Sequence, residues 1–409
     1  MSPARKTTVF TVIAVATAVT AALAGCSSTG STDSPGGTAT SSAASQVAIT
    51  LNAGGSGDSC DLSTTTAKAG PVTFTITNKT STAITEVELL SAGRILGEKE
   101  NLAPGLGAVS FTSTLGGGRY QIYCPGAEKE TTAFTVTGKA AAAPKGGVQG
   151  LLKQGTTGYA TYVAGVLTNM TTAVDNLQTA VDSGDLAKAK AAYALARPFY
   201  ERIESDVDGF VLPGFKATDN AGNLDYLIDM RASNLDDAVG WHGFHAVERD
   251  LYGTGAITDG TKQLAAELTS NVGKLNALAE KLTYKPEDLA NGAAGLLEEV
   301  QSEKIKGEEE AFSHLDLIDF AANVEGAKQA FAFLEPGMKK IDPDLTKTVN
   351  TQFAAVATLL EKYQDPSAAG GYVTYTPELR ATDAGTLSQA VQALQDPLSK
   401  IAEKVATAR

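Results

Sequence analysis

The chain contains few of the residues that bind soft metals or stack against sugars. Its 409 residues include three histidines, three cysteines and one tryptophan. Residues 47–138 contain neither histidine nor methionine. A blue-copper electron-transfer centre is therefore excluded there, because it requires two histidines, a cysteine and usually an axial methionine. A single tryptophan also offers no aromatic platform for glycans, which argues against a structural or glycan-binding function.

Positive charge is also in short supply. The sequence has 33 lysines and arginines against 46 aspartates and glutamates, which gives a formal net charge of -13. Proteins that bind nucleic acid neutralise phosphates with basic side chains, so we expect no nucleic-acid partner. A strongly acidic protein attracts cations, although acidity also serves solubility.

The N-terminal segment has the features of an export signal. Arg5 and Lys6 precede an almost wholly apolar stretch, residues 9–23, which is shorter than the roughly 20 residues that a membrane span needs. Small residues then lead into Cys26, an ending that resembles the cleavage site of bacterial lipoproteins. We predict a signal peptide over residues 1–25 and a lipidated Cys26, so that the protein is extracytoplasmic and tethered to the membrane by lipid. An uncleaved membrane anchor is the alternative.

The composition of the remaining chain predicts a multidomain protein. Residues 26–46 are rich in Ser, Thr, Gly and Ala and should form a flexible spacer. Residues 47–138 alternate polar and apolar side chains in about six short runs between turns, which is typical of a small all-β sandwich. Residues 139–147 read as a linker. Residues 148–409 have apolar residues every three or four positions, which predicts a large all-α domain of packed helical bundles.

Two of the three histidines lie in one short segment together with a carboxylate. His245 and Glu248 are three residues apart, and His242 lies one helical turn earlier. On a helix, side chains at this spacing share one face. Such a pair can chelate a cation on a backbone that is already rigid. The spacing by itself is weak evidence, because most pairs of this kind are solvated, so further ligands have to come from other helices.

Two other segments of the predicted helical domain carry carboxylates. Glu201 and Glu204 repeat the one-turn spacing on an earlier helix. Asp229 lies among apolar neighbours that would carry it into the interior, where a carboxylate is costly unless it is paired or bound to a metal. Pairing with Arg197 or Arg231 would explain a buried Asp229 equally well.

Four segments of this domain resemble, in the same order, the sequence blocks of the imelysin family. They are residues 200–204 (YERIE), 227–231 (LIDMR), 243–252 (GFHAVERDLY) and 306–320 (KGEEEAFSHLDLIDF). The resemblance implies an extracytoplasmic iron-binding protein in which an N-terminal cupredoxin-like domain precedes the helical domain. It implies as partners an iron permease and a haem peroxidase of the same uptake system. It also implies a metal site that is built from Glu201, Glu204, Asp229, His245 and Glu248.

The chemistry of this set agrees with iron as Fe2+ or Fe3+. Four carboxylates and one imidazole suit iron, manganese or zinc and disfavour Cu(I). His242 departs from the family pattern, and we expect it to be an ordinary residue rather than a sixth ligand. A second acidic group could bind another cation, but we expect a solvated face and leave it out of the site; it consists of Glu308, Glu309, Glu310, His314, Asp316 and Asp319.

Cys60 and Cys124 are the only cysteines apart from Cys26. In an oxidising compartment two cysteines usually form a disulfide, and closing a loop of this length contributes about 4 kcal/mol in the chain-entropy model. The resemblance suggests an alternative, in which both thiolates join Glu86 and Glu88 in a second metal site of the small domain, for example for copper.

The leading interpretation is a binding protein rather than an enzyme. The alternative is a metal-dependent peptidase of the imelysin type. His245 and Glu248 lack the second histidine and the adjacent glutamate of the His-Glu-x-x-His peptidases. Four anionic ligands would also reduce the electrophilicity of a bound zinc ion, so we expect no catalytic residues.

Overall fold

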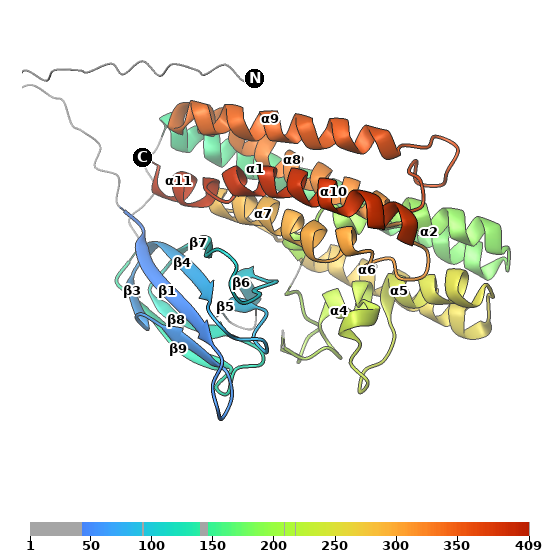
Figure 1. Cartoon of the computed structure of the whole chain (residues 1–409), viewed down its shortest axis with the longest axis horizontal. Coiled ribbons are helices and arrows are strands. Elements are labelled where there is room, and N and C mark those ends of the chain that lie inside the picture. The colour runs from blue at the N-terminus through green and yellow to red at the C-terminus, as the bar shows by residue number, and fades with distance from the viewer. Residues whose placement is uncertain (1–42, 92–93, 140–145, 208, 217, 409) are drawn as a thin grey trace, which may run out of the picture. The chain divides into compact units, whose positions relative to one another are not determined.

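The computed structural model describes residues 43–91, 94–139, 146–207, 209–216 and 218–408. The predicted signal peptide, Cys26, the spacer up to residue 42 and most of the predicted linker lie outside the described residues. Among the described residues, no helix is both long and apolar enough to span a membrane. A β-sheet region precedes a large helical region (Figure 1), so the predicted two-domain layout is confirmed.

The β region consists of two sheets around one apolar core. Its strands are β1 (Ser45–Asn52), β2 (Ser59–Leu62), β3 (Thr66–Lys68), β4 (Gly70–Asn78), β5 (Val87–Ser91), β6 (Arg94–Lys99), β7 (Val109–Leu115), β8 (Gly118–Tyr123) and β9 (Thr131–Thr137). The strand orders are β2-β1-β4-β7 and β3-β9-β8-β5-β6. Strand β1 is parallel to β4, and β3 is parallel to β9. Alternate residues of β1, namely Val47, Ile49 and Leu51, are buried in the core, as their spacing predicts.

Cys60 and Cys124 form a disulfide that links β2 to the segment after β8. This is the pairing that the compartment argument predicts. A disulfide leaves no thiolate to bind a metal, so the alternative copper site on these two cysteines has no support.

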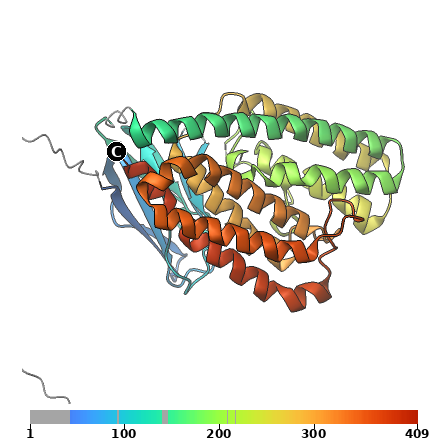
Figure 2. The same ribbon diagram turned by 90° about the horizontal axis from the view of Figure 1, so that it is seen from above.

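The helical region consists of α1 (Gly147–Asp182), α2 (Leu186–Glu201), α3 (Glu204–Val207), α4 (Leu224–Asp229), α5 (Gly243–Glu248), α6 (Asp259–Ala279), α7 (Pro286–Ser302), α8 (Asp316–Ile341), α9 (Pro343–Leu360), α10 (Pro377–Leu398) and α11 (Ile401–Thr407). The long helices run side by side (Figures 1 and 2), with α1 against α2, α6 and α8. Their apolar faces share one core, as amphipathic spacing predicts.

The helix that carries the first carboxylates breaks between them. Helix α2 ends at Glu201, and α3 begins only at Glu204. The expectation that both lie one turn apart on one helix is therefore wrong. Pro198 lies in the last turn of α2 and has no N–H to donate. The backbone carbonyl of Glu201, at the end of α2, accepts a hydrogen bond of 2.8 Å from the side chain of Asn323 on α8.

Gly243 allows α5 to begin directly beside the end of α4. Its φ is 69°, in the left-handed region that favours glycine. A Cβ at this position would lie 2.0 Å from the carbonyl oxygen of Ile228. Because no other residue fits this contact, Gly243 brings His245 of α5 next to Asp229 of α4.

Candidate metal centre

Charged side chains from several helices meet inside the helical region. They come from α2, α3, α4, α5, α8 and the segment between α7 and α8. Each member of this buried cluster exposes at most 9% of its surface; the members are Arg197, Glu201, Glu204, Asp229, His245, Glu248, Lys304, Glu309, Glu310 and Asp319. Burial of so many charges is costly unless each finds an opposite charge or a bound cation.

His245 lies between four carboxylates. Its Nδ1 is 3.1 Å from Glu248 Oε2 and 4.0 Å from Glu310 Oε1. Its Nε2 is 3.4 Å from Glu309 Oε1 and 3.6 Å from Asp229 Oδ1. Within the described part of the chain, this buried Nε2 atom makes no hydrogen bond. Ligand atoms of Asp229, His245 and Glu309 lie within 4.8 Å of one another, and so do those of His245, Glu248 and Glu310. Either group could hold a cation.

The structure brings together three of the five residues that the sequence suggests as ligands. Asp229 and Glu248 each approach His245, Asp229 at the Nε2 atom and Glu248 at the Nδ1 atom of the ring. Glu201 and Glu204 belong to the same buried cluster but face Lys304, at 3.2 and 3.6 Å from its Nζ. His242 lies before α5, and its Nδ1 is 3.1 Å from Glu267, which is not a member of the cluster.

The expectation of a solvated acidic face between residues 308 and 319 is wrong. Glu309, Glu310, Asp316 and Asp319 are each at most 1% exposed, while Glu308 and His314 are half-buried. The burial of Asp316 and Asp319 could have been predicted from their spacing on a helix. Asp316 and Asp319 share one face of α8 with Asn323 and Ala327, which are also buried.

Two buried cations, Arg197 and Lys304, balance part of the negative charge of the cluster. Arg197 pairs with Glu201 and Asp229. It also lies 3.1 Å from Glu309 and Glu310 and 3.4 Å from Asp319. Of the two arginines suggested as partners for Asp229, Arg197 forms the salt bridge. Asp229 also lies 3.6 Å from His245.

Burial and neighbouring charges change the pKa values within the cluster in opposite directions. Burial raises the pKa of Asp229 to about 8, although Arg197 and His245 act to lower it. Burial, together with the charge of Glu248, raises the pKa of Glu310 to about 7. For Glu309, burial is outweighed by Lys304 and Arg231, which hold its pKa well below its usual value. Glu309 is therefore the carboxylate that its neighbours hold most strongly in the ionised form, whereas burial favours the protonated forms of Asp229 and Glu310.

Hydrogen bonds from the segment before α8 fix the orientation of Glu248, and a hydrogen bond from α2 fixes that of Glu310. Glu248 Oε1 accepts from the backbone N–H groups of Phe312 and Ser313 at 2.8 and 2.6 Å. Glu310 Oε1 accepts from the hydroxyl of Tyr193 at 2.8 Å. Ligand carboxylates that are held in this way lose little conformational freedom on binding a cation.

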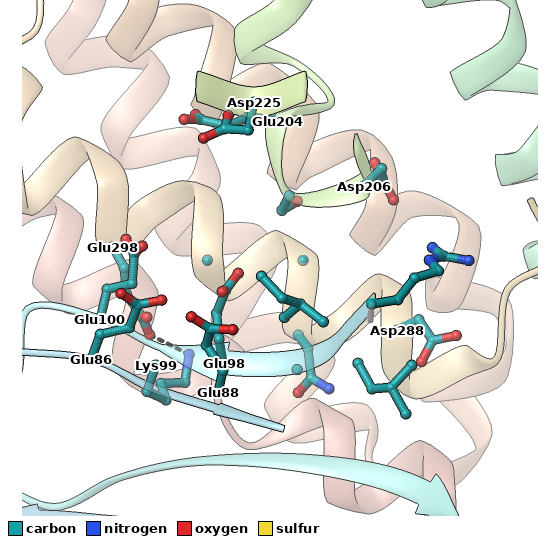
Figure 3. Close-up of a pocket in the computed structure, with 18 of the residues that line it drawn as sticks. Glu86, Glu88, Glu98, Lys99, Glu100, Glu204, Asp206, Asp225, Asp288 and Glu298 are labelled. Carbon is teal, nitrogen blue, oxygen red and sulfur yellow. Dashed lines mark hydrogen bonds and ion pairs between the residues drawn. The ribbon is translucent and has the colours of Figure 1, made fainter. Parts of the chain in front are cut away.

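A cavity of about 660 Å³ adjoins the cluster. Figure 3 shows acidic side chains that line it from the β5–β6 part of the β region and from α3, α4 and α7. Glu204 lies on the wall of this cavity and also contacts Lys304. Glu204 therefore connects the buried cluster with solvent.

Asp316 offers a measurable consequence of burial. Burial, with the charge of Glu310, raises its pKa to about 8 from the ordinary 3.8. Because the folded pKa is raised, the stability linked to this group is present at low pH and is lost as the pH rises. Asp316→Asn should gain stability relative to the unchanged protein between about pH 5 and about pH 9, by at most about 6 kcal/mol. Urea unfolding at each pH measures the difference.

Asp185→Asn is the matched control for that titration. Asp185 is partly exposed and caps α2 by accepting from the backbone N–H of Lys188, and asparagine caps helices equally well. The pKa of Asp185 is lowered by its hydrogen bond with the Lys188 side chain, so its contribution is lost only as the pH falls. If the gain in stability of Asp316→Asn varied as little between about pH 5 and about pH 9 as that of Asp185→Asn, burial would not raise the pKa of Asp316.

Comparisons of the sequence with known proteins identify one family. The sequence model of the imelysin family matches residues 155–401. The iron uptake system component EfeO of Escherichia coli (strain K12) and that of Shigella flexneri are each 34% identical over 354 residues, which cover 86% of this chain and 88% of the relative. A putative iron-regulated protein A precursor from Parabacteroides distasonis aligns with a TM-score of 0.47 and 16% identity over 64% of this chain and 97% of its own. The sequence matches show that the chain belongs to the imelysin family, among proteins of the EfeO type.

Proposed function

We propose that this protein is the extracytoplasmic iron-binding component of an uptake system of the EfeUOB type. It captures iron and delivers it to an iron permease, and a haem peroxidase is the third component. The two relatives are named iron uptake system components. The predicted signal over residues 1–25 and the lipidated Cys26 would tether the protein to the outer face of the cell membrane.

The observation that carries the proposal is the position of His245. Its ring is 1% exposed, and its Nε2 points at the carboxylates of Asp229 and Glu309 without a hydrogen bond to any described residue. A buried ring nitrogen that lies near two carboxylates but makes no hydrogen bond of normal geometry is costly. A cation at this point would accept the Nε2 lone pair and pair with both carboxylates, which removes that cost.

The donor set favours iron over softer metals. Imidazole and carboxylate ligands suit Fe2+, Fe3+, Mn2+ and Zn2+, and the cluster contains no sulfur ligand that would select Cu(I). The ligands nearest to His245 are Asp229, Glu248, Glu309 and Glu310. Two of these, Glu309 and Glu310, join the set of ligands that the sequence suggested. Glu201 and Glu204 lie next to them, around Lys304.

The adjoining cavity is the route that we assign to the incoming ion. Its acidic wall raises the local concentration of cations, and Glu204 lies between the cavity and the cluster. The small domain contributes Glu86, Glu98 and Glu100 to this wall. We keep the cupredoxin-like interpretation of that domain for its fold and assign it no copper.

We propose binding rather than catalysis. The carboxylates around His245 are engaged with Arg197, Lys304 or backbone N–H groups, so none is available as the general base that a metallopeptidase requires.

Titration of the purified protein with Fe2+ under anaerobic conditions tests the proposal. Isothermal calorimetry should show saturable binding, because the ligands are already assembled and lose little freedom. Cells that lack the protein should take up radioactive iron more slowly at low iron concentration. Absence of any saturable binding of Fe2+ or Fe3+ would refute the iron-carrier function, and hydrolysis of unfolded casein by the metal-loaded protein would favour the peptidase.

A further inference from the structure

Lys304 lies in the buried cluster where a bound cation would be expected. It belongs to the short helix η3 (Lys304–Lys306) and is 1% exposed. Its Nζ is 3.2 Å from Glu201 Oε2, 3.4 Å from Glu309 Oε2 and 3.6 Å from Glu204 Oε2 and Glu299 Oε2. Four carboxylate oxygens from separate residues thus surround one ammonium group.

The ammonium is held by charge rather than by directed hydrogen bonds. Within the described residues, Lys304 Nζ has no hydrogen-bond partner of normal geometry. Among the described residues, Glu201 Oε2 and Glu204 Oε2 also have no hydrogen-bond partner. An ammonium is a compact point charge on a flexible stem with three rotatable donors. A multivalent ion attracts the same oxygens more strongly than one positive charge does.

The backbone around Lys304 is fixed, so its side chain is the part that can move. The carbonyl of Ile305 accepts from the hydroxyl of Tyr375 at 3.0 Å. The carbonyl of Lys306 accepts from Arg380 at 2.5 Å. Because the backbone is fixed, the ammonium group stays close to the four carboxylates even when the side chain changes conformation.

We propose that Lys304 is an internal cation that competes with bound iron for the carboxylates of Glu201, Glu204 and Glu309. This inference rests on the proposed iron-carrier function and goes beyond it, because it explains how affinity is limited. A carrier must release its cargo, and a tethered ammonium that returns to the carboxylates lowers the cost of release. The same competition disfavours monovalent ions, which gain no charge over the ammonium that they displace.

Three substitutions of Lys304 test the competition. Lys304→Met removes the charge, and Lys304→Gln keeps a polar group that can still donate to two oxygens. Both should bind Fe2+ more tightly, by about tenfold or more, since no ammonium has to be displaced. Lys304→Arg keeps the charge, and so keeps the fold, and its guanidinium presents a fork that matches carboxylates better. It should bind Fe2+ less tightly than the unchanged protein.

Lys99→Met is the matched control. Lys99 is 3% exposed and pairs with Glu298, which does not contact Lys304. Its replacement removes one buried ammonium and should change Fe2+ affinity by less than about threefold. Calorimetric titration with Fe2+ alone, with folding checked by circular dichroism, gives all these affinities.

A double-substitution cycle separates competition from a general change in charge. If Lys304 competes for Glu204, then Glu204→Gln should weaken Fe2+ binding by less than about threefold in the unchanged protein, because the lost ligand is offset by a weaker hold on the ammonium. In Lys304→Met, the same change should cost about tenfold or more. If Glu204→Gln had the same effect on Fe2+ affinity in the unchanged protein and in Lys304→Met, only the overall charge of the cluster would determine affinity. That result would overturn the inference.

The outcomes are distinguishable. Saturable Fe2+ binding by the unchanged protein, with the affinity order Arg, Lys and then Gln or Met from weakest to tightest, supports the competition. If Met and Gln do not fold, the Arg variant decides, since binding equal to or tighter than that of the unchanged protein overturns the inference. Saturable binding with no dependence on residue 304 overturns the inference alone. Absence of binding in every protein overturns the iron-carrier function and this inference together.

Discussion

His245→Ala is expected to weaken Fe2+ binding by about 100-fold or more. The change removes the one imidazole that lies among Asp229, Glu248, Glu309 and Glu310. Loss of a group in or next to a metal's coordination shell commonly costs about 10- to 100-fold in affinity, and His245 belongs to both groups of ligand atoms that could hold a cation. The substitution leaves all carboxylates in place, so the negative field of the cluster persists. Equilibrium titration at physiological salt measures the loss.

His242→Ala is the control for that experiment. His242 is only three residues away, but its ring contacts Glu267 and the carbonyl of Val239 rather than the cluster. We expect the His242→Ala variant to bind Fe2+ with an affinity within about threefold of that of the unchanged protein, the scale of a screened charge effect. Binding by His245→Ala as tight as that by His242→Ala would show that bulk acidity, rather than a defined site, attracts the metal.

The strands that could be predicted from the sequence are those with an alternating pattern. Strands β1 and β9 alternate buried and more exposed side chains, because one face of each strand meets the core. Strands β4, β7 and β8 follow this alternation only in part. Strands β2 and β3 have four and three residues, too few for a pattern. Strand β6 lies at a sheet edge and contains no buried residue before Lys99. Strand β3 is defined by its pairing with the distant β9, whereas β2 and β6 are defined by pairing with the preceding strands β1 and β5.

The site could be predicted only where its residues carry a local pattern. His245 and Glu248 form a helical pair, and Asp229 stands among apolar residues. Glu309 and Glu310 occur in a run of three glutamates, which is usually solvated. They are buried because the chain before α8 folds against α5, where Phe312 and Ser313 donate to Glu248. His314 adopts a φ of 58° in this segment. Such long-range contacts leave no mark on sequence spacing.

The role of Lys304 was equally hidden from the sequence. Lysines at the end of a helix usually interact with solvent and the helix dipole. Here the segment after α7 turns Lys304 inward toward Glu201, while Lys306 remains exposed. The difference arises from the contacts of Tyr375 and Arg380 with this segment, which join residues about seventy positions apart.

Arg197→Met is expected to lower the free energy of unfolding by about 3–5 kcal/mol, the usual cost of removing one partner from a buried ion pair. Arg197 is 1% exposed and pairs with Asp229, Glu201, Glu309, Glu310 and Asp319. Methionine preserves much of the side-chain volume, so the loss reflects carboxylates left without their cation rather than a cavity. Urea unfolding followed by circular dichroism gives the free energy.

Arg202→Met on the turn after α2 is the matched control. Arg202 pairs with the exposed Glu325 at 2.9 Å, and its own side chain is 23% exposed. Surface pairs of this kind contribute less than about 1 kcal/mol. Saturating Fe2+ should restore part of the stability of Arg197→Met, because an ion bound to the folded protein pairs with the same carboxylates, and it should do so more than for Arg202→Met. Equal losses in the two variants would mean that the carboxylates around Arg197 are protonated rather than charge-paired, since a neutral cluster has no need of the guanidinium.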